Sequence, residues 1–171
     1  MRLRSLVIRK GWHRSMFAWK PFFKNGKVFT FTFNDTARYQ LLPPHELDIN
    51  KLVGFADGCL NHHKNSFRIG WRYVSVDDSV EIIAYTYVDG VREVKVLETI
   101  NLYDVMQVEV ICQDSVYRVL INGYKVHYIR RSSNIKWRYK HLLYPYFGGV
   151  KTAPHFILIM LNWNSLPKIK K

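Results

Sequence analysis

The sequence predicts an all-β protein, built as an antiparallel two-sheet β-sandwich or jelly roll. Its 171 residues include 17 valines, 13 isoleucines, 6 threonines and 26 aromatic residues, all of which favour strands, against only five alanines and five glutamates. No stretch of eleven or more residues has a convincing 3.6-residue apolar period, so a parallel architecture would lack its crossover helices. A closed barrel is the alternative arrangement for about ten antiparallel strands.

Strand patterns recur along the whole chain. In residues 28–33 phenylalanine alternates with valine or threonine, so the three phenylalanines share one face, which we expect to be buried. One helix-like segment, 44–52, is at most two turns long. The further strands are expected at 66–74, 80–88, 92–97, 106–112, 116–121, 125–129 and 155–163.

Turn residues predict three hairpins between 66 and 129. Asn122-Gly123 is the strongest signal, because both residues tolerate the positive φ of a type I′ turn and alternating strands flank them. Asp89-Gly90 repeats the pattern, and Asp77-Asp78 repeats it more weakly.

The chain is expected to form a single β-sandwich domain over 1–171, with a basic N-terminal arm at about 1–20 and a short basic tail at 164–171. Its length allows a core that needs no metal or disulfide, and its 48% hydrophobic content excludes intrinsic disorder. Cys59 and Cys112 are 53 positions apart without metal-ligand spacing. We expect them to be buried thiols rather than a disulfide.

The charge predicts attraction to polyanions. Lysine and arginine number 26 and the acidic residues 13, which gives a net charge of +13. Nucleic acid, an acidic glycan, lipopolysaccharide and an acidic protein all fit this sign, and solubility alone would also explain it. The side chains that could contact nucleic acid are Arg2, Arg4, Arg9, Lys10, His13, Arg14, Arg130, Arg131, the 136–140 stretch, Lys168, Lys170 and Lys171. No known nucleic-acid module accompanies them.

Targeting signals are not visible in the sequence. The basic N-terminus is followed by an apolar stretch of only Leu6 to Ile8, too short for a signal peptide. The longest apolar run, 156–161, is far shorter than a transmembrane helix and is typical of a buried strand. A cytoplasmic protein or a virion component is therefore expected.

The densest polar cluster is 57–66, which leads into the strand at 66–74. His63 and Asn65 supply groups that bond sugar hydroxyls, and Arg68 and Arg72 supply guanidinium groups for a carboxylate or sulfate. Strand alternation places both arginines on one face and turns Trp71 towards the core.

The adjacent pair His62-His63 has no further ligand at a diagnostic spacing. We therefore expect no metal site, and no cofactor motif is present either. Hydrogen bonding within the loop is the expected role of this pair.

A second candidate region is 144–155. Gly148-Gly149 allows a tight backbone path between two prolines, Tyr144 or Tyr146 could stack on a sugar, and His155 could face a ligand. A hairpin connection with buried tyrosines would give the same pattern.

Catalytic motifs are weak. The four strand glutamates show no paired-carboxylate pattern for a glycosidase, and serine or cysteine nucleophile motifs and phosphate loops are absent. A uronate lyase would need a base and a group that neutralises the carboxylate. His63, Asn65, Arg68, Arg72 and Tyr144 include the right residue types, although these are common.

Several segments together resemble the concanavalin-like jelly-roll sandwiches, and in particular small proteins of this kind from gut Bacteroidetes and their phages. These segments are 51–58, 62–72, 81–87, 143–149 and 153–155, and the resemblance spans most of 27–163. It implies a two-sheet sandwich of a type that often binds polysaccharide on its concave face and sometimes cleaves it. The strand motifs of the family's lyases and glycosidases do not occur in this sequence.

The prediction for function is therefore a non-enzymatic, lectin-like module that binds carbohydrate, with an anionic polysaccharide as the expected ligand. The expected ligand-binding residues are His63, Asn65, Arg68, Arg72, Tyr144, Tyr146 and His155. A structural protein of a phage virion, assembled as an oligomer or with acidic neighbours, is the alternative. A uronate-specific polysaccharide lyase is the second alternative.

Overall fold

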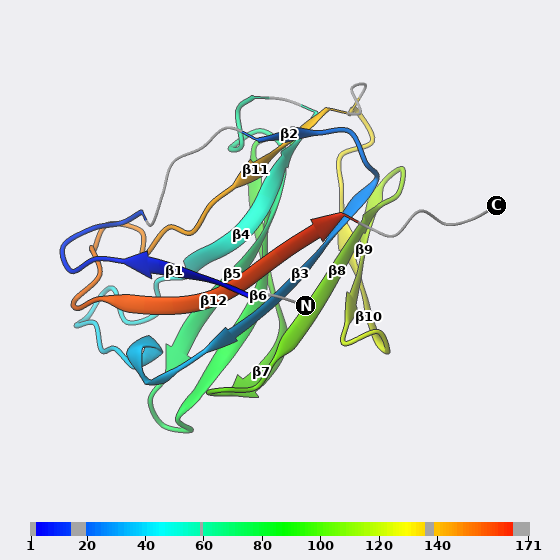
Figure 1. The fold of residues 1–171 in the computed structure, drawn as a ribbon. Helices are drawn as coiled ribbons and strands as arrows, with labels where there is room; N and C mark the ends of the chain where they lie inside the picture. Colours follow the sequence, from blue (N-terminus) through cyan, green and yellow to red (C-terminus); the bar gives the residue numbers. More distant parts are fainter. Residues whose placement is uncertain (1–2, 15–19, 59, 136–138, 166–171) are drawn as a thin grey trace.

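Two six-stranded antiparallel sheets pack face to face in the computed structural model (Figure 1). The structure describes residues 3–14, 20–58, 60–135 and 139–165. Cys59, Lys136, Arg138 and the tail residues 166–171, which include Lys168, Lys170 and Lys171, lie outside the described residues, as does Arg2. The predicted all-β, two-sheet jelly-roll class is confirmed, and the only helical element in the described part is a 3-10 turn, Asp35–Ala37.

The first sheet has the strand order β1-β12-β3-β8-β9-β10. Its strands are β1 Arg4–Ile8, β12 Ile157–Ser165, β3 Gly26–Phe33, β8 Met106–Cys112, β9 Val116–Ile121 and β10 Lys125–Arg130. As expected from the alternation, Phe29, Phe31 and Phe33 of β3 are buried in the core, each 1% exposed or less. Hydrophobic burial on this inner face holds the sheet against its partner.

The second sheet has the order β2-β11-β4-β5-β6-β7. Its strands are β2 Pro21–Phe22, β11 Lys140–Leu143, β4 Asn50–Asp57, β5 Ser66–Val74, β6 Ser79–Val88 and β7 Val91–Asn101. The three predicted hairpins join β5 to β6, β6 to β7 and β9 to β10. Trp71 of β5 is fully buried and packs against Phe33 of the first sheet, with ring centroids 4.8 Å apart.

Four strands of the structure differ from the sequence prediction. β1, β2, β4 and β11 were not expected, and the helix-like segment 44–52 forms no helix. Leu52 and Val53 are instead fully buried in β4, because this strand is central in its sheet and pairs on both sides. Such strands depend on partners that are distant in sequence, which local patterns do not reveal.

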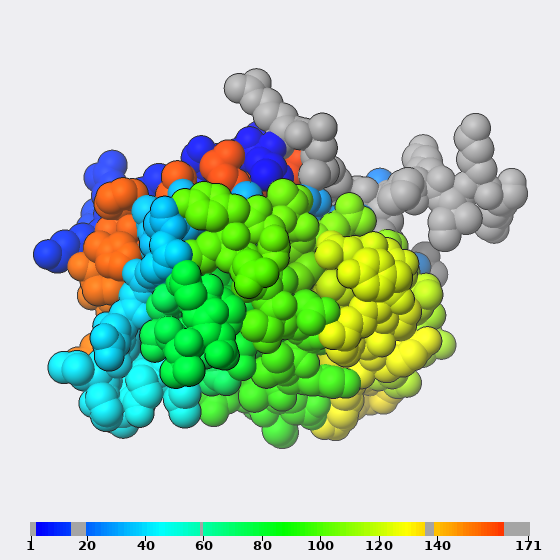
Figure 2. Space-filling model, turned by 90° about the horizontal axis from the view of Figure 1, so that it is seen from below, coloured from blue at the N-terminus to red at the C-terminus, as the bar shows by residue number. Residues whose placement is uncertain are grey.

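The edge strands β7 and β10 of the two sheets approach each other along one side of the sandwich (Figure 2). Lys125 forms an ion pair with Glu98 at 2.8 Å, and Arg130 forms one with Glu93 at 2.6 Å. The two ion pairs therefore connect β7 of the second sheet to β10 of the first sheet.

Candidate functional site

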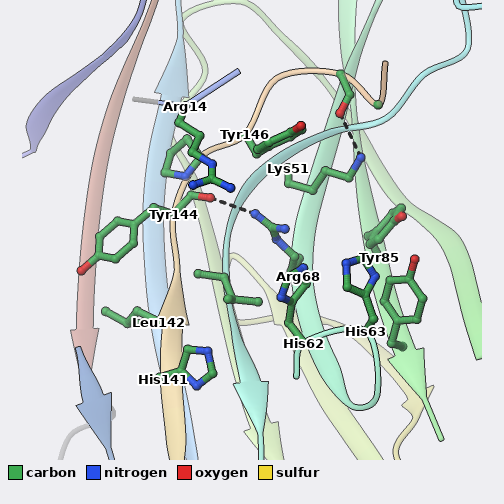
Figure 3. A pocket seen from close by; sticks show the side chains of 15 residues that line it. Arg14, Lys51, His62, His63, Arg68, Tyr85, His141, Leu142, Tyr144 and Tyr146 are labelled. Atoms are coloured by element: carbon green, nitrogen blue, oxygen red, sulfur yellow. Dashed lines mark hydrogen bonds between the residues drawn. The ribbon is translucent and has the colours of Figure 1, made fainter. Parts of the chain in front are cut away.

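A pocket of about 520 Å³ opens on the outer face of the second sheet (Figure 3). The strand register explains its floor. Leu143, Gly54, Arg68 and Tyr85 lie in one row across β11, β4, β5 and β6, and the neighbouring row holds His141 and Tyr87. The residues that line the pocket are Arg14, Lys51, His62, His63, Arg68, Tyr85, Tyr87, His141, Leu142, Leu143, Tyr144, Pro145, Tyr146, Gly148 and Gly149.

Arg68 lies at the centre of this floor. Phe67 and Ile69 point into the core, so the strand alternation turns Arg68 to the outer face. Its side chain passes over Gly54, where an added Cβ would lie 2.1 Å from the Phe67 carbonyl oxygen and 3.0 Å from the Arg68 Cγ. Arg68 Nη2 donates a hydrogen bond of 2.8 Å to the carbonyl oxygen of Tyr144.

The Arg68 guanidinium is buried without a carboxylate. Arg68 is only 9% exposed, and burial lowers its pKa to about 10. Its Nε is buried and makes no hydrogen bond with any residue that the structure describes. None of the residues that line the pocket is an aspartate or a glutamate. Burying a charge without an opposite charge is costly, so this arrangement favours an anion in the pocket.

Two other largely buried cations, Arg131 and Lys140, have an acidic partner, whereas the buried Lys27 lies over the Phe22 ring. Asp57, which is fully buried, pairs with Arg131 at 2.7 Å and with Lys140 at 3.4 Å, and it also accepts a 2.9 Å hydrogen bond from the Tyr117 hydroxyl. The contrast with Arg68 shows that the fold supplies carboxylates elsewhere and leaves the pocket cationic.

Lys51 is a second cation in the pocket. Its Nζ donates a hydrogen bond of 3.1 Å to the carbonyl oxygen of Gly148 and lies 4.9 Å from the centroid of the Tyr85 ring. Burial, followed by repulsion from Arg68, lowers the pKa of Lys51 to about 8. Gly148 has φ +64, and an added Cβ there would lie 2.3 Å from the Lys151 carbonyl oxygen, so this turn requires glycine.

Three histidines extend the polar lining. Burial, followed by the neighbouring His63, lowers the pKa of His62 to about 4, so His62 is neutral at pH 7. Burial also lowers the pKa of His141, whose Nδ1 is buried and has no hydrogen-bond partner among the described residues. Neutral imidazoles can donate to and accept from ligand hydroxyls.

Tyrosines form the aromatic part of the lining. Tyr85 and Tyr87 project from β6, and the ring of His63 contacts that of Tyr87 at 5.0 Å. His13 stacks on the Tyr146 ring at 4.8 Å. Tyr144 lines the pocket through its backbone carbonyl, whereas its ring points away and packs against the core (Figure 3).

Of the residues expected from the sequence, His63, Arg68, Tyr144 and Tyr146 come together in this pocket. Three others do not line it. Asn65 Oδ1 accepts a hydrogen bond of 2.9 Å from the Asp89 amide. Arg72 forms an ion pair with Glu81 at 2.5 Å. His155 Nε2 lies 3.0 Å from the Thr36 carbonyl oxygen. Each of these three side chains therefore contacts another part of the protein instead of lining the pocket.

Lys51, Tyr85, Tyr87, Arg14 and His141 line the pocket but were not among the expected ligand-binding residues. Arg14 reaches the site because its backbone bridges to Tyr146. For Tyr85 a signal existed: the hairpin at Asp77-Asp78 sets a register that places it opposite Arg68. Tyr87 lies on the same hairpin, whereas Lys51, Arg14 and His141 depend on pairing between segments far apart in the chain.

Within the described residues, no group of three or more histidine, cysteine, aspartate or glutamate side chains could hold a metal ion. No helix in the same part of the chain is long and apolar enough to cross a membrane.

The sequence matches no protein-family model and no curated protein. Solved structures do match the fold. The alginate lyase AlyC3 has a TM-score of 0.66 at 7% identity, covering 96% of this chain and 75% of its own. A mutant of the alginate lyase Aly36B, in complex with alginate trisaccharide, has a TM-score of 0.59 at 12% identity, covering 96% of this chain and 82% of its own.

A further match is a GH16 protein from the Bacteroides ovatus mixed-linkage glucan locus, in complex with a product. Its TM-score is 0.52 at 13% identity, covering 94% of this chain and 79% of its own. The chain therefore has the concanavalin-like jelly-roll fold of these glycan-active proteins. At such low identity the likeness concerns the fold alone.

Proposed function

We propose that this protein is a carbohydrate-binding module whose pocket holds an acidic unit of a polysaccharide without cleaving it. The observation that carries the proposal is the buried Arg68 guanidinium, which has no carboxylate partner and has a free Nε in the described structure. A carboxylate of the ligand would supply the missing charge beside the guanidinium and accept hydrogen bonds from it.

The second cation supports the same ligand. Lys51 and Arg68 are close enough that the charge of Arg68 lowers the pKa of Lys51. An anion bound between them would relieve this repulsion as well as the desolvation of both groups. A neutral sugar would leave both costs in place.

The remaining lining suits the rest of a sugar unit. The rings of Tyr85 and Tyr87 offer apolar surface for the C–H face of a pyranose, and His62 and His141 offer hydrogen bonds to hydroxyls. The volume of about 520 Å³ lies within the range of ordinary ligand pockets. A uronate combines all these features, and alginate, the ligand of the fold neighbour Aly36B, is the natural first probe.

Isothermal titration calorimetry with alginate trisaccharide tests this proposal. Arg68→Met is the test variant, and Arg72→Met is its matched control, because Arg72 lies on the same strand and is neutralised by Glu81. We expect Arg68→Met to weaken binding about 100-fold and Arg72→Met to leave it within about twofold. A neutral glucan oligosaccharide should not bind. If neither saccharide binds to the parent protein, the proposal is wrong.

A lyase activity is the second candidate, and Lys51 is the observation that favours it. A pKa of about 8 leaves a fraction of its amine neutral near pH 7, so it could accept a proton. In β-elimination a base removes the proton beside the carboxylate, the bond to the leaving oxygen breaks, a carbon–carbon double bond forms, and an acid protonates the leaving oxygen. Tyr85, whose ring centroid lies 4.9 Å from Lys51 Nζ, is the nearby acid.

The two candidates differ in one readout. The double bond formed by elimination absorbs ultraviolet light, so incubation with alginate should raise the absorbance only if the protein is a lyase. We expect no rise. A rise in absorbance that disappears in Lys51→Met would show that the protein is a lyase and would contradict the proposal of a binding module.

A structural role in a phage particle, the other alternative from the sequence, needs no ligand in the pocket. It predicts that Arg68→Met has no effect on any glycan interaction. The calorimetric experiment therefore separates this alternative from the other two.

A further inference from the structure

We propose that an external subsite, formed by Trp12 and Arg9, binds a further acidic unit of the same polysaccharide chain outside the pocket. This inference rests on the proposed function, since it assumes that the pocket holds one end or one part of an acidic glycan. The surface loop that carries Arg9 and Trp12 precedes Arg14, and neither Arg9 nor Trp12 lines the pocket.

The loop is held against the pocket wall by backbone hydrogen bonds. The Gly11 amide donates to the Ala153 carbonyl oxygen at 2.9 Å, the Ala153 amide donates to Trp12 at 3.0 Å, and the Phe147 amide donates to His13 at 2.7 Å. The blue N-terminal loop and the orange 145–155 segment lie side by side in both views (Figures 1 and 2). The wall formed by 144–149 is therefore continuous with Trp12.

Two pairs of an arginine and an aromatic ring follow one another on this path. Arg14 Cζ lies 6.0 Å from the Tyr146 centroid at the pocket, and Arg9 Cζ lies 5.7 Å from the Trp12 centroid outside it. One residue separates Trp12 from Arg14, a spacing of about 7 Å in extended backbone. Each pair offers an apolar ring for a sugar face beside a guanidinium for its carboxylate, so the arrangement matches a repeating acidic chain.

The exposure of Trp12 also indicates a ligand. The indole is 57% exposed although it is fixed beside Arg9, so the hydrophobic core does not explain its presence. Phe156, which is likewise 57% exposed, directly precedes Ile157, the partner of Ile8 in the pairing of β12 with β1.

The charge around this loop has the sign that the ligand requires. The loop 9–14 contains Arg9, Lys10 and Arg14, the wall segment 144–155 contains Lys151, and neither segment contains an aspartate or a glutamate. Lys10 and Lys151 are exposed on the two sides of the contact. The Asp48 carboxylate, from a segment outside the loop and the wall, accepts a hydrogen bond of 3.4 Å from the Gly149 amide and lies 3.4 Å from His45.

The experiment compares two lengths of one ligand. Calorimetry is carried out with alginate trisaccharide and with an alginate oligosaccharide of about nine units, because a second subsite adds affinity only to a chain that reaches both. The variants are Trp12→Ala and Arg9→Gln, with Trp12→Phe as a conservative control. Tyr128→Ala is the matched surface control, since this exposed tyrosine lies on β10, at the opposite edge of the first sheet.

We expect the longer chain to bind the parent protein about tenfold more tightly than the trisaccharide. Trp12→Ala and Arg9→Gln should remove this gain and leave the trisaccharide affinity unchanged, while Trp12→Phe should keep most of it and Tyr128→Ala all of it. Equal affinity for both lengths in the parent protein would overturn the external subsite and leave the pocket proposal standing. Loss of trisaccharide binding in Trp12→Ala would also overturn it, and no binding of either length would overturn both proposals.

Discussion

Arg68 and Tyr144 are joined by a 2.8 Å hydrogen bond from the guanidinium Nη2 to the backbone carbonyl oxygen. This contact links β5 to the segment that follows β11, 76 residues later in the chain. It holds the guanidinium at the pocket floor by one nitrogen and leaves Nε without a partner in the described structure. One side of the guanidinium is thus fixed by the protein, and no carboxylate of the pocket lining neutralises its charge.

The path of Arg68 over Gly54 leads to the first prediction. Gly54→Ala would place its Cβ 2.1 Å from the Phe67 carbonyl oxygen and 2.6 Å from the Arg68 Cα, so the two strands would have to separate. We expect the free energy of unfolding to fall by about 3 kcal/mol, measured by urea denaturation. In the control, Gly149→Ala, the added Cβ meets only the Asp48 carboxylate at 3.3 Å and should cost much less. Equal losses for the two variants would contradict the proposed crossing.

The buried carboxylate Asp57 gives a second prediction, about stability. Asp57→Asn leaves Arg131 and Lys140 without a negative partner, and such losses cost about 3–5 kcal/mol. Tyr117→Phe removes only one hydrogen bond to the same carboxylate and should cost about 1 kcal/mol. Denaturation of the two variants at pH 7 checks the order. A smaller effect for Asp57→Asn would show that the two cations do not depend on this group.

The pH dependence of ligand binding gives a third prediction. Lys51 has a pKa of about 8, below its usual 10.5, so its positive charge is present below pH 8 and is lost as the pH rises through this value. Affinity for an acidic saccharide should therefore be constant up to about pH 7 and should fall several-fold by about pH 9. Calorimetry across this range measures the fall. Lys51→Arg keeps its charge and should show no fall, and the same decrease in Lys51→Arg would assign the effect to another group.

The effect of Lys51 on the stability of the ligand-free protein has the opposite pH dependence: ligand affinity falls as the pH rises, whereas the destabilisation caused by Lys51 decreases. Because the folded protein holds this group at a lower pKa than the unfolded chain does, its charged form destabilises the fold at neutral pH. This penalty is fully present below about pH 8 and disappears as the pH rises towards 10.5. Lys51→Met should therefore be more stable than the parent at pH 7, by thermal denaturation, with a gain that shrinks at higher pH. A destabilised Lys51→Met at pH 7 would contradict this reasoning.

Much of the fold could be predicted because its signals are local. The alternation in 28–33 placed Phe29, Phe31 and Phe33 in the core, and Asn122-Gly123 marked a hairpin that the structure contains. The strands β1, β2 and β11 are short, and β11 is only four residues long, so their patterns are too brief to identify them. Their pairing with distant segments creates them.

The site was predicted in part for the same reason. Alternation places Arg68 and Arg72 on one face, but it does not tell which of them is neutralised. The register of the β5–β6 hairpin decides this, since Arg72 lies opposite Glu81 and Arg68 lies opposite Tyr85. Arg14 joins the site through its bridge to Tyr146, and Lys51 through its place in β4 and a second bridge to Tyr146, and no short-range pattern encodes these bridges.

If Arg68 binds the carboxylate of an acidic sugar, a crystal structure of the complex with alginate trisaccharide will show the contact. We expect a carboxylate oxygen about 2.9 Å from the Arg68 guanidinium, with Lys51 on its other side and a sugar face against Tyr85 or Tyr87. A saccharide bound elsewhere on the protein, with the pocket empty at saturating concentration, would contradict the claim.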